Sequence, residues 1–475
     1  MNQKEIQEKI LALIKKDEKK NEGEEKELFR DYTLTVLFLK FVTELSSDLQ
    51  EGLIQSNAFK DLIVPEAADF QKLYKKRNSL GNMTRLDEAL RSLEETNPPL
   101  KGIFKMIRFQ SLQFGSLKKT DEILGRVLQR FGDPKFSLRP SLLGGIESIG
   151  GFYEQLIRNF VTGISSDQNL LNAPPEISNL LINLCSPKGT EKIFDPICGT
   201  GNLLTVAGKF IRQTGDENSC ELYGNEWNER TWAFAKLNLF LHGEDNEGLN
   251  SERLETDITI QTEDGRKQKF DVITTTTLMD HTIIESMLEK LDDENGRMVS
   301  LVSQGLLYRE GNENRQDKMN YRLVEKEFRE RILEKNLLES VIALPEKLFH
   351  GNTPPISIMI FSKRKKDEMV LFVDARKQHA SEHRKNSILP KHITWIRDAV
   401  FKRSSEQPYI QLISIKRIMN EGGQLVAHRY LREMQPPTGD LQQLLKERKS
   451  LNEELDKIGN RFENMIQLIE MKNKK

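Results

Sequence analysis

The segment Asp195-Pro-Ile-Cys-Gly-Thr-Gly201 constrains the fold of this chain more than any other feature of its sequence. It follows a short apolar run, Ile193-Phe194, and leads into a helical pattern that includes Leu203, Leu204 and Phe210. Glycines at a strand-to-helix turn let the backbone approach a ligand closely, and the helix N-terminus offers free N–H groups. The segment therefore predicts a cofactor-binding turn in an α/β fold.

Short apolar strands alternate with helical segments between Phe152 and about Lys363. Such alternation is typical of an α/β fold with a Rossmann-like, mainly parallel sheet and helices on both faces. The predicted strands are Lys192–Phe194, Glu221–Glu226, Phe270–Thr275, Met298–Val302, Leu338–Leu344 and Ile356–Phe361, with one more at Val370–Val373.

The patterns divide the chain into three parts. Residues 1–150 carry apolar residues at helical spacing, so we expect a helical N-terminal domain there. A glycine-rich passage at Gly144, Gly145, Gly150 and Gly151 marks its boundary. Residues 151–365 contain most of the predicted sheet, and residues 366–475 form a C-terminal extension that ends in a helix at about 438–472.

This last helix carries apolar residues in alternating steps of four and three, the seam of a coiled coil. Packing on its own domain and docking on a partner's helix both fit, but the narrow seam and charged flanks favour a partner. The seam residues are Leu451, Leu455, Ile458, Phe462, Met465 and Ile469.

Charge and cysteine content limit the class of protein. The formal net charge of −1 gives no bulk basic field for nucleic acid, so positive charge would have to be local or supplied by a partner. Three cysteines without metal-ligand spacing are typical of a reducing cytosol and predict no metal site. The longest apolar stretch, around Val36 to Val42, contains Lys40 and is too short to span a bilayer, so we expect a cytoplasmic protein.

Two acidic residues follow the predicted cofactor turn. Glu226 stands where the second strand of a nucleotide-binding fold ends, and a carboxylate there can accept hydrogen bonds from both ribose hydroxyls. The alternative is a solvated acid at a strand end. Asp257 closes the next segment and could meet an adenine amine, although a surface acid fits equally well.

Together these residues resemble the methylation subunit of type I restriction-modification systems, over nearly the whole chain. The family's adenosylmethionine loop is matched from Asp195 to Gly201, and its Gly-x-Glu and Asn-Leu-x-Leu-His-Gly elements by Gly224, Glu226 and Asn238–Gly243. Further similar passages lie at Phe29–Tyr32, Tyr153–Ile157, Ile342–Pro345 through Leu348-Phe349, and His428–Leu431.

The resemblance implies a class I methyltransferase domain that uses S-adenosyl-L-methionine to methylate adenine in DNA. It implies that the C-terminal helix binds a DNA-specificity subunit and that the complex binds DNA. A further partner would be an active methyltransferase or a restriction subunit. The cofactor-binding residues that it implies are Asp195, Pro196, Cys198, Gly199, Thr200, Gly201, Glu226, Asp257 and Pro174.

The reacting end departs from the family pattern, which places Asn-Pro-Pro-Phe two residues after Phe-Asp-Val-Ile. Thr276, Thr277, Leu278 and Met279 occupy those positions. The adenine amine is a weak nucleophile, and an amide oxygen and a proline-fixed carbonyl would accept its protons, while the ring stacks on the flipped base. Threonine, leucine and methionine supply neither that rigid set nor the ring, so we expect no intact catalytic motif.

Two further passages bear on this prediction. Leu171-Asn-Ala-Pro174 stands where the family carries Phe-Tyr-Thr-Pro, and Asn202 and Leu203 replace the Gly-Phe after the loop, which weakens the expectation of cofactor binding. Asn97-Pro-Pro-Leu100 has nearly the letters of the reaction motif but follows a helical pattern, so we interpret it as structural.

Three hypotheses remain open. The preferred one is a catalytically impaired, adenosylmethionine-binding subunit of a DNA modification or antiviral defence complex. The second is an active adenine methyltransferase with unusual hydrogen-bond acceptors, and the third is a structural scaffold without a ligand.

Overall fold

The computed structural model describes most of the chain. Asp257 and the helix predicted at about 438–472 lie outside the described residues. The described residues are 24–105, 109, 116–133, 136–161, 173–215, 220–250, 267–309, 321–349, 354–382, 385–405 and 408–431, with residues 5, 8 and 12.

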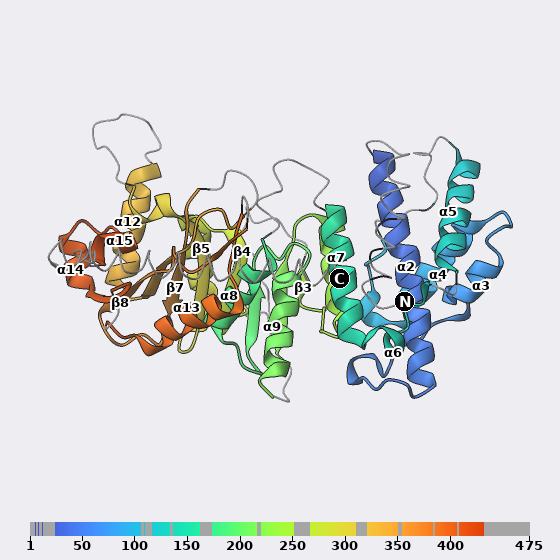
Figure 1. The fold of residues 1–475 in the computed structure, drawn as a ribbon, viewed down its shortest axis with the longest axis horizontal. Coiled ribbons are helices and arrows are strands. Elements are labelled where there is room, and N and C mark those ends of the chain that lie inside the picture. Colours follow the sequence, from blue (N-terminus) through green and yellow to red (C-terminus); the bar gives the residue numbers. More distant parts are fainter. Residues whose placement is uncertain are drawn as a thin grey trace, which may run out of the picture.

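A nine-stranded sheet in the order β11-β8-β6-β7-β5-β4-β1-β2-β3 forms the centre of the molecule (Figure 1). All seven predicted strands are present within a few residues of their expected bounds. The strands are β1 Lys192–Asp195, β2 Glu221–Asn225, β3 Leu249–Asn250, β4 Val272–Leu278, β5 Arg297–Ser303, β6 Leu338–Ala343, β7 Ile356–Ser362, β8 Met369–Asp374 and β11 Ile410–Ser414. A separate hairpin pairs β9 Ala380–Glu382 with β10 Lys385–Ser387.

The sheet is mainly parallel, as predicted, with two antiparallel insertions. Strand β7 runs antiparallel between β5 and β6, and β11 runs antiparallel to β8. Because β8 and β11 belong to this sheet, it continues beyond residue 365. Strand order reverses at β1, which lies between β2 and β4, and the crevice at such a switch point is where open α/β sheets bind ligands.

Helices cover both faces of the sheet because its central strands are buried on both sides, with neighbours such as Ile193 and Phe194 belonging to opposite cores. One face packs against α8 Pro175–Cys185, α9 Asn202–Gln213, α10 Glu229–Leu241 and α13 Pro390–Lys402. The other packs against α11 His281–Lys290, α12 Tyr321–Glu334, α14 Ile415–Asn420 and α15 Ala427–Tyr430.

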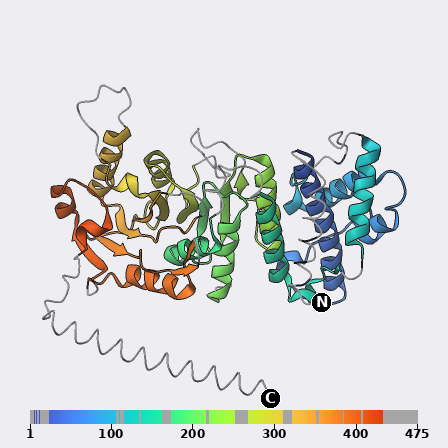
Figure 2. The ribbon, with the colours of Figure 1, turned by 45° about the horizontal axis from the view of Figure 1, so that its top comes forward.

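The N-terminal part is helical and lies at one end of the molecule, beside β3 and α10 (Figures 1 and 2). No strand occurs between residues 24 and 161 where the structure describes them. The helices are α2 Glu24–Gln50, α3 Phe70–Lys75, α4 Asn82–Thr96, α5 Leu117–Phe131, α6 Pro140–Leu143 and α7 Ile146–Val161. Short 3-10 turns are η1 Asn57–Phe59, η2 Glu66–Ala68 and η3 Pro98–Leu100, and η6 Gln304–Leu307 follows β5.

Helix α10 joins the helical part to the sheet. Every residue from Ala233 to Leu241 is buried, so the helix is covered all round. Phe234 and Phe240 belong to the core of the helical part, whereas Ala235 and Leu239 belong to the core of the sheet. The two cores therefore share one wall.

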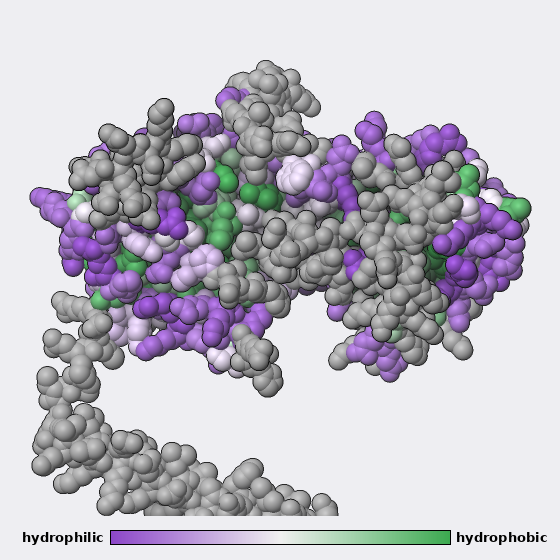
Figure 3. All heavy atoms as spheres, turned by 90° about the horizontal axis from the view of Figure 1, so that it is seen from above, coloured by the Kyte–Doolittle hydropathy of each residue, from purple (hydrophilic) through white to green (hydrophobic). Residues whose placement is uncertain are grey.

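The surface of the described residues is mainly hydrophilic in the view of Figure 3, in agreement with a mean hydropathy of −0.56. Among the described helices, none has both the length and the apolar character needed to cross a bilayer.

Candidate functional site

The predicted cofactor turn connects β1 to α9 and contains two glycines, Gly199 and Gly201, with different surroundings. Gly199 and Gly201 have φ angles of 54° and 75°, in the left-handed region that favours glycine. A Cβ on Gly201 would lie 3.3 Å from the carbonyl oxygen of Ala235, so this glycine also allows α10 to pack closely. A Cβ on Gly199 would meet nothing within 4 Å, so this side of the turn is open.

Hydrogen bonds hold the turn against the end of β2. The N–H of Cys198 donates to the carbonyl of Asn225 at 2.9 Å, and the N–H of Gly201 donates to the carbonyl of Cys198 at 2.8 Å. The turn is therefore fixed to the neighbouring strand before any ligand binds.

Asp195 closes β1 and is only 1% exposed. Its Oδ1 accepts a hydrogen bond from the N–H of Ile197 at 3.0 Å. Burial raises the pKa of Asp195 to about 7, and the charge of Glu226 adds to this, whereas hydrogen bonds from Thr275 and Ile197 favour the ionised form. The structure thus keeps a carboxyl group in a dry position beside the turn.

Glu226 directly follows β2 and is 6% exposed. Its Oε1 accepts a hydrogen bond from the N–H of Asn228 at 2.8 Å. Burial raises the pKa of Glu226, while hydrogen bonds from the N–H groups of Asn228 and Gly199 oppose that rise. The interaction with Gly199 brings Glu226 to the cofactor turn, where the sequence predicted it.

Trp227, which the sequence interpretation missed, follows Glu226 and is 56% exposed. A large exposed aromatic ring next to a buried acid offers a flat apolar face to a ligand. Its position directly after a strand-end acid was the signal that could have identified it.

Pro174 is buried at the N-cap of α8. In the first turn of that helix, Ser178 Oγ accepts a hydrogen bond from Asn202 Nδ2 at 3.4 Å. The start of α8 therefore lies beside the start of α9, which follows the cofactor turn.

The reacting end lies on β4, next to β1. Thr275 pairs with Ser300 of β5, and Leu278 pairs with the next residue, Leu301, so Thr276 and Thr277 form a bulge. Bulges of this kind re-aim side chains and are frequent beside active sites. The Thr275 hydroxyl lies 3.4 Å from the carbonyl of Ile197, which places the bulge close to the cofactor turn.

Met279 occupies the position of the family's aromatic residue and is 2% exposed. Its N–H donates to the carbonyl of Leu301 at 2.8 Å, so pairing with β5 continues to this point. Asp280 then caps α11 by accepting from the N–H of Ile283 at 2.9 Å. The Met279 side chain is therefore part of the core, and residue 279 offers no aromatic ring.

The passage Asn97-Pro-Pro-Leu100 has a structural role, as predicted. The Oδ1 of Asn97 accepts from the N–H of Ile63 at 3.0 Å, and its Nδ2 donates to the carbonyls of Ile63 and Leu93 at 2.7 and 2.8 Å. Because backbone groups occupy both the oxygen and the nitrogen of the Asn97 side-chain amide, this amide does not bind a target adenine.

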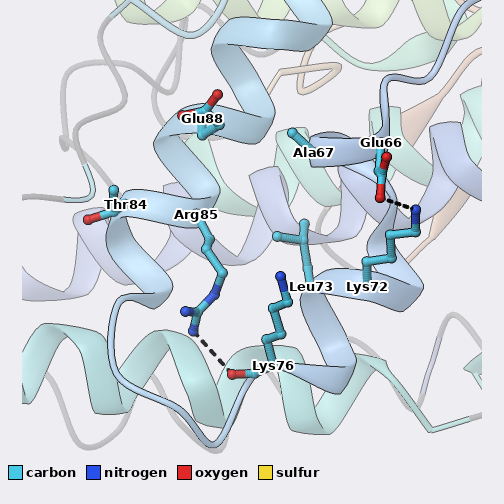
Figure 4. A pocket seen from close by; sticks show the side chains of 8 residues that line it. All are labelled: Glu66, Ala67, Lys72, Leu73, Lys76, Thr84, Arg85 and Glu88. Atoms are coloured by element: carbon cyan, nitrogen blue, oxygen red, sulfur yellow. Dashed lines mark hydrogen bonds and ion pairs between the residues drawn. The ribbon is translucent and has the colours of Figure 1, made fainter.

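A pocket of about 440 Å³ lies in the helical part, between α3 and α4 (Figure 4). Lys72 forms an ion pair with Glu66 at 2.7 Å, and Arg85 donates to the carbonyls of Lys76 and Ser79 at 3.1 and 2.9 Å. The predicted site residues do not line it; its residues are Glu66, Ala67, Lys72, Leu73, Lys76, Thr84, Arg85 and Glu88. Among the residues that the structure describes, no cluster of three or more histidine, cysteine or acidic side chains could hold a metal ion.

The chain matches two family models. Residues 145–277 and 261–436 match the one described as N-6 DNA Methylase, and residues 17–131 match the one described as HsdM N-terminal domain.

Named relatives agree with these matches. The type I restriction enzyme MjaVII methylase subunit of Methanocaldococcus jannaschii is 25% identical over 80% of this chain and 68% of its own length. The MpnII methylase subunit of Mycoplasma pneumoniae is 22% identical over 85% of each chain.

Solved structures share the fold. The type I restriction-modification methyltransferase subunit from Streptococcus thermophilus has a TM-score of 0.71 at 18% identity, covering 91% of this chain and 100% of that one. A modification subunit of a putative type I restriction enzyme from Vibrio vulnificus has a TM-score of 0.56 at 14% identity, covering 90% and 95%.

Proposed function

Because the chain belongs to the N-6 DNA methylase family, with relatives named as type I restriction enzyme methylase subunits, we propose that it is a catalytically impaired methylase subunit that binds S-adenosylmethionine. It acts in a DNA modification or defence complex. The observation that carries this proposal is the contrast between an intact cofactor turn and a buried Met279 at the reacting end.

The residues at the switch point fit the nucleoside part of the cofactor. The carboxylate of Glu226 lies beside the N–H of Gly199, where it can accept hydrogen bonds from ribose hydroxyls. Trp227 offers a face on which adenine can stack, and the open side of Gly199 allows close approach to the backbone. Bound there, S-adenosylmethionine would supply a methyl group activated by the sulfonium.

The acceptor side lacks the groups that adenine methylation requires. The amine of adenine needs preorganised acceptors for its protons, and one such group typically contributes about 100- to 1,000-fold in rate. Here the four family positions hold two threonines, a leucine and a core methionine, and pairing with β5 continues through Met279. At Met279, strand pairing and burial take the place of an exposed aromatic ring.

One observation favours the rival hypothesis of an active enzyme. Thr276 and Thr277 bulge from β4 beside the cofactor turn and are partly exposed, so their hydroxyls could accept hydrogen bonds.

The partners that we propose are a DNA-specificity subunit and DNA within the complex, with an active methylase copy or a restriction subunit beside them. The net charge of −1 supports this because the chain itself lacks a bulk basic field, and the specificity subunit would supply the phosphate contacts.

Cofactor binding is tested by isothermal titration of the full chain with S-adenosylmethionine. We expect saturable binding in the native chain and none after Asp195→Ala combined with Glu226→Ala. No detectable binding at millimolar concentration would remove the cofactor part and favour the scaffold hypothesis, most clearly if the double variant still assembles with its partners.

Catalysis is tested on the complex purified with its native partners, with labelled S-adenosylmethionine and varied duplex DNA. We expect that any methyl transfer in the complex is unchanged by Thr276→Ala, because another subunit performs it. Transfer that disappears with Thr276→Ala would show an active subunit and overturn the proposal.

A further inference from the structure

A buried amide of α10 holds the cofactor turn. Asn238 is 0% exposed, and its Nδ2 donates to the carbonyl oxygen of Thr200 at 3.0 Å. That carbonyl shares a planar peptide unit with the N–H of Gly201, which donates to the carbonyl of Cys198 at 2.8 Å. The orientation of this peptide plane is thus fixed from both sides.

The same residue is linked to the helical part of the molecule. The carbonyl of Asn238 lies 2.8 Å from Nδ1 of His242, and because a carbonyl can only accept, this nitrogen carries the proton. The ring of His242 packs against Gly150 of α7, where a Cβ would lie 2.8 to 3.0 Å from three ring atoms. The ring therefore packs closely on the backbone of α7 at Gly150.

We propose that Asn238 is a positioning residue for the cofactor turn, and that His242 and Gly150 connect its position to the packing of α7. Asn238 does not touch the ligand in this scheme; it sets the Thr200–Gly201 peptide that the ligand meets. The inference rests on the proposed binding of S-adenosylmethionine at this turn.

The physical reason is the cost of an unpaired polar group. Without the Asn238 amide, the Thr200 carbonyl loses its donor, and rotation of the peptide toward water would also turn away the Gly201 N–H. Because Gly201 has no Cβ, it tolerates other φ values, and the peptide can rotate at low cost once the Asn238 donor is gone. A turn that occupies two conformations binds its ligand more weakly.

The chain offers a matched control for Asn238. Asn246 is equally buried, and its Nδ2 also donates to backbone carbonyls, those of Pro99 at 2.9 Å and Lys236 at 3.0 Å. Neither of these carbonyls belongs to the cofactor turn. Asn238→Leu and Asn246→Leu therefore remove the same chemistry from two places.

We expect Asn238→Leu to weaken S-adenosylmethionine binding about tenfold, measured by isothermal titration, and Asn246→Leu by less than about twofold. Both variants lower the thermal midpoint, so a purely structural role predicts similar affinities in the two. Equal affinities in the two variants would overturn the proposal.

Amide hydrogen exchange of residues 195–201 without ligand provides a readout that does not depend on binding. We expect faster exchange at Cys198 and Gly201 in Asn238→Leu and unchanged exchange in Asn246→Leu, compared with the native chain. If the native chain does not bind S-adenosylmethionine, the proposed function fails while this exchange experiment still tests the positioning role. Unchanged exchange in Asn238→Leu would refute that role.

A second matched pair tests the link to α7. Gly150→Ala places a methyl group against the His242 ring, whereas Gly151→Ala places it in open space on the same helix. We expect Gly150→Ala to weaken S-adenosylmethionine binding about threefold and to speed exchange at Gly201, with Gly151→Ala unchanged. Identical behaviour of the two alanine variants would remove His242 and Gly150 from the proposal.

Discussion

The ends of β1 and β4 lie side by side and have opposite characters. The strands pair directly, Ile193 with Val272 and Phe194 with Ile273. Beyond β1 the chain turns sharply through two left-handed glycines, and the space beside Gly199 is open. Beyond the bulge of β4 the chain keeps pairing with β5 and enters the core at Met279.

This difference indicates that the stability of the fold and the identity of the functional residues are independent at a strand end. Strand pairing and core packing satisfy β4 without the residues of a reaction motif. The fold therefore accommodates different residues at this strand end, and function depends on which residues are placed there.

The strongest way to break the contrast is to rebuild the reacting end. We expect the combined change Thr276→Asn, Thr277→Pro, Leu278→Pro and Met279→Phe to raise methyl transfer to adenine at least about 100-fold over the native chain. Labelled S-adenosylmethionine and the reconstituted complex measure it, with Glu226→Ala in the same background as the control. A native chain that is already as fast as the rebuilt one would contradict the expectation.

The folding stability of Asp195→Asn, compared with that of the native chain at two pH values, sharpens the contrast. Since the folded-state pKa is about 7 against an ordinary value of 3.8, ionisation of Asp195 lowers folding stability as pH rises from about 4 to 7. Asparagine still accepts from the Ile197 N–H but stays neutral, so the variant is more stable at pH 8 by up to about 4 kcal/mol. Urea denaturation should show this gain at pH 8 and its disappearance near pH 4; equal gains at both pH values would be inconsistent with a buried, titrating carboxyl.

Glu226→Gln tests the cofactor end directly. We expect affinity for S-adenosylmethionine to fall about 10- to 100-fold, because hydrogen bonds to a charged acceptor contribute about 1.5–3 kcal/mol. Glu221→Gln is the control at the other end of the same strand, where the side chain is half exposed. The assignment of the ribose site to Glu226 fails if the two variants bind equally well.

Trp227→Ala is expected to have the smallest effect, about tenfold or less in affinity, because it removes one stacking surface. Trp227→Phe keeps a ring and should retain most of the affinity. Titration of S-adenosylmethionine should also quench tryptophan emission in the native chain. Retention of full affinity and quenching in Trp227→Ala would place adenine elsewhere.

The sequence predicted the strand, turn and helix around Gly201 because their signal is local. The order strand, glycine turn and apolar helix fixes Asp195 and Gly201, and the next strand carries Glu226 to the same edge. Most of the seven predicted strands are apolar runs buried on both faces. Strand β11 was missed because its edge position leaves Gln411 and Leu412 partly exposed, which weakens the apolar pattern.

The conformation of the reacting end could not be predicted from the sequence. Substitution at Thr276 to Met279 was visible, but the bulge depends on the register of β4 against Ser300 and Leu301. The burial of Met279 likewise depends on residues far away in the chain, such as those of α12 in the same core. Long-range packing of this kind leaves no local pattern.

Because helix α10 packs in both cores, it determines how the protein can be divided into fragments. The rings of Phe38 and Phe59 in the N-terminal part lie 6.0 and 5.2 Å from that of Phe240, so a recombinant fragment of residues 1–161 would leave their edges in water. Such a fragment would aggregate or melt early, and the intact chain would lose both halves in one cooperative transition. Expression of the helical half by itself therefore requires residues up to Leu241, or polar replacements where those rings would be uncovered.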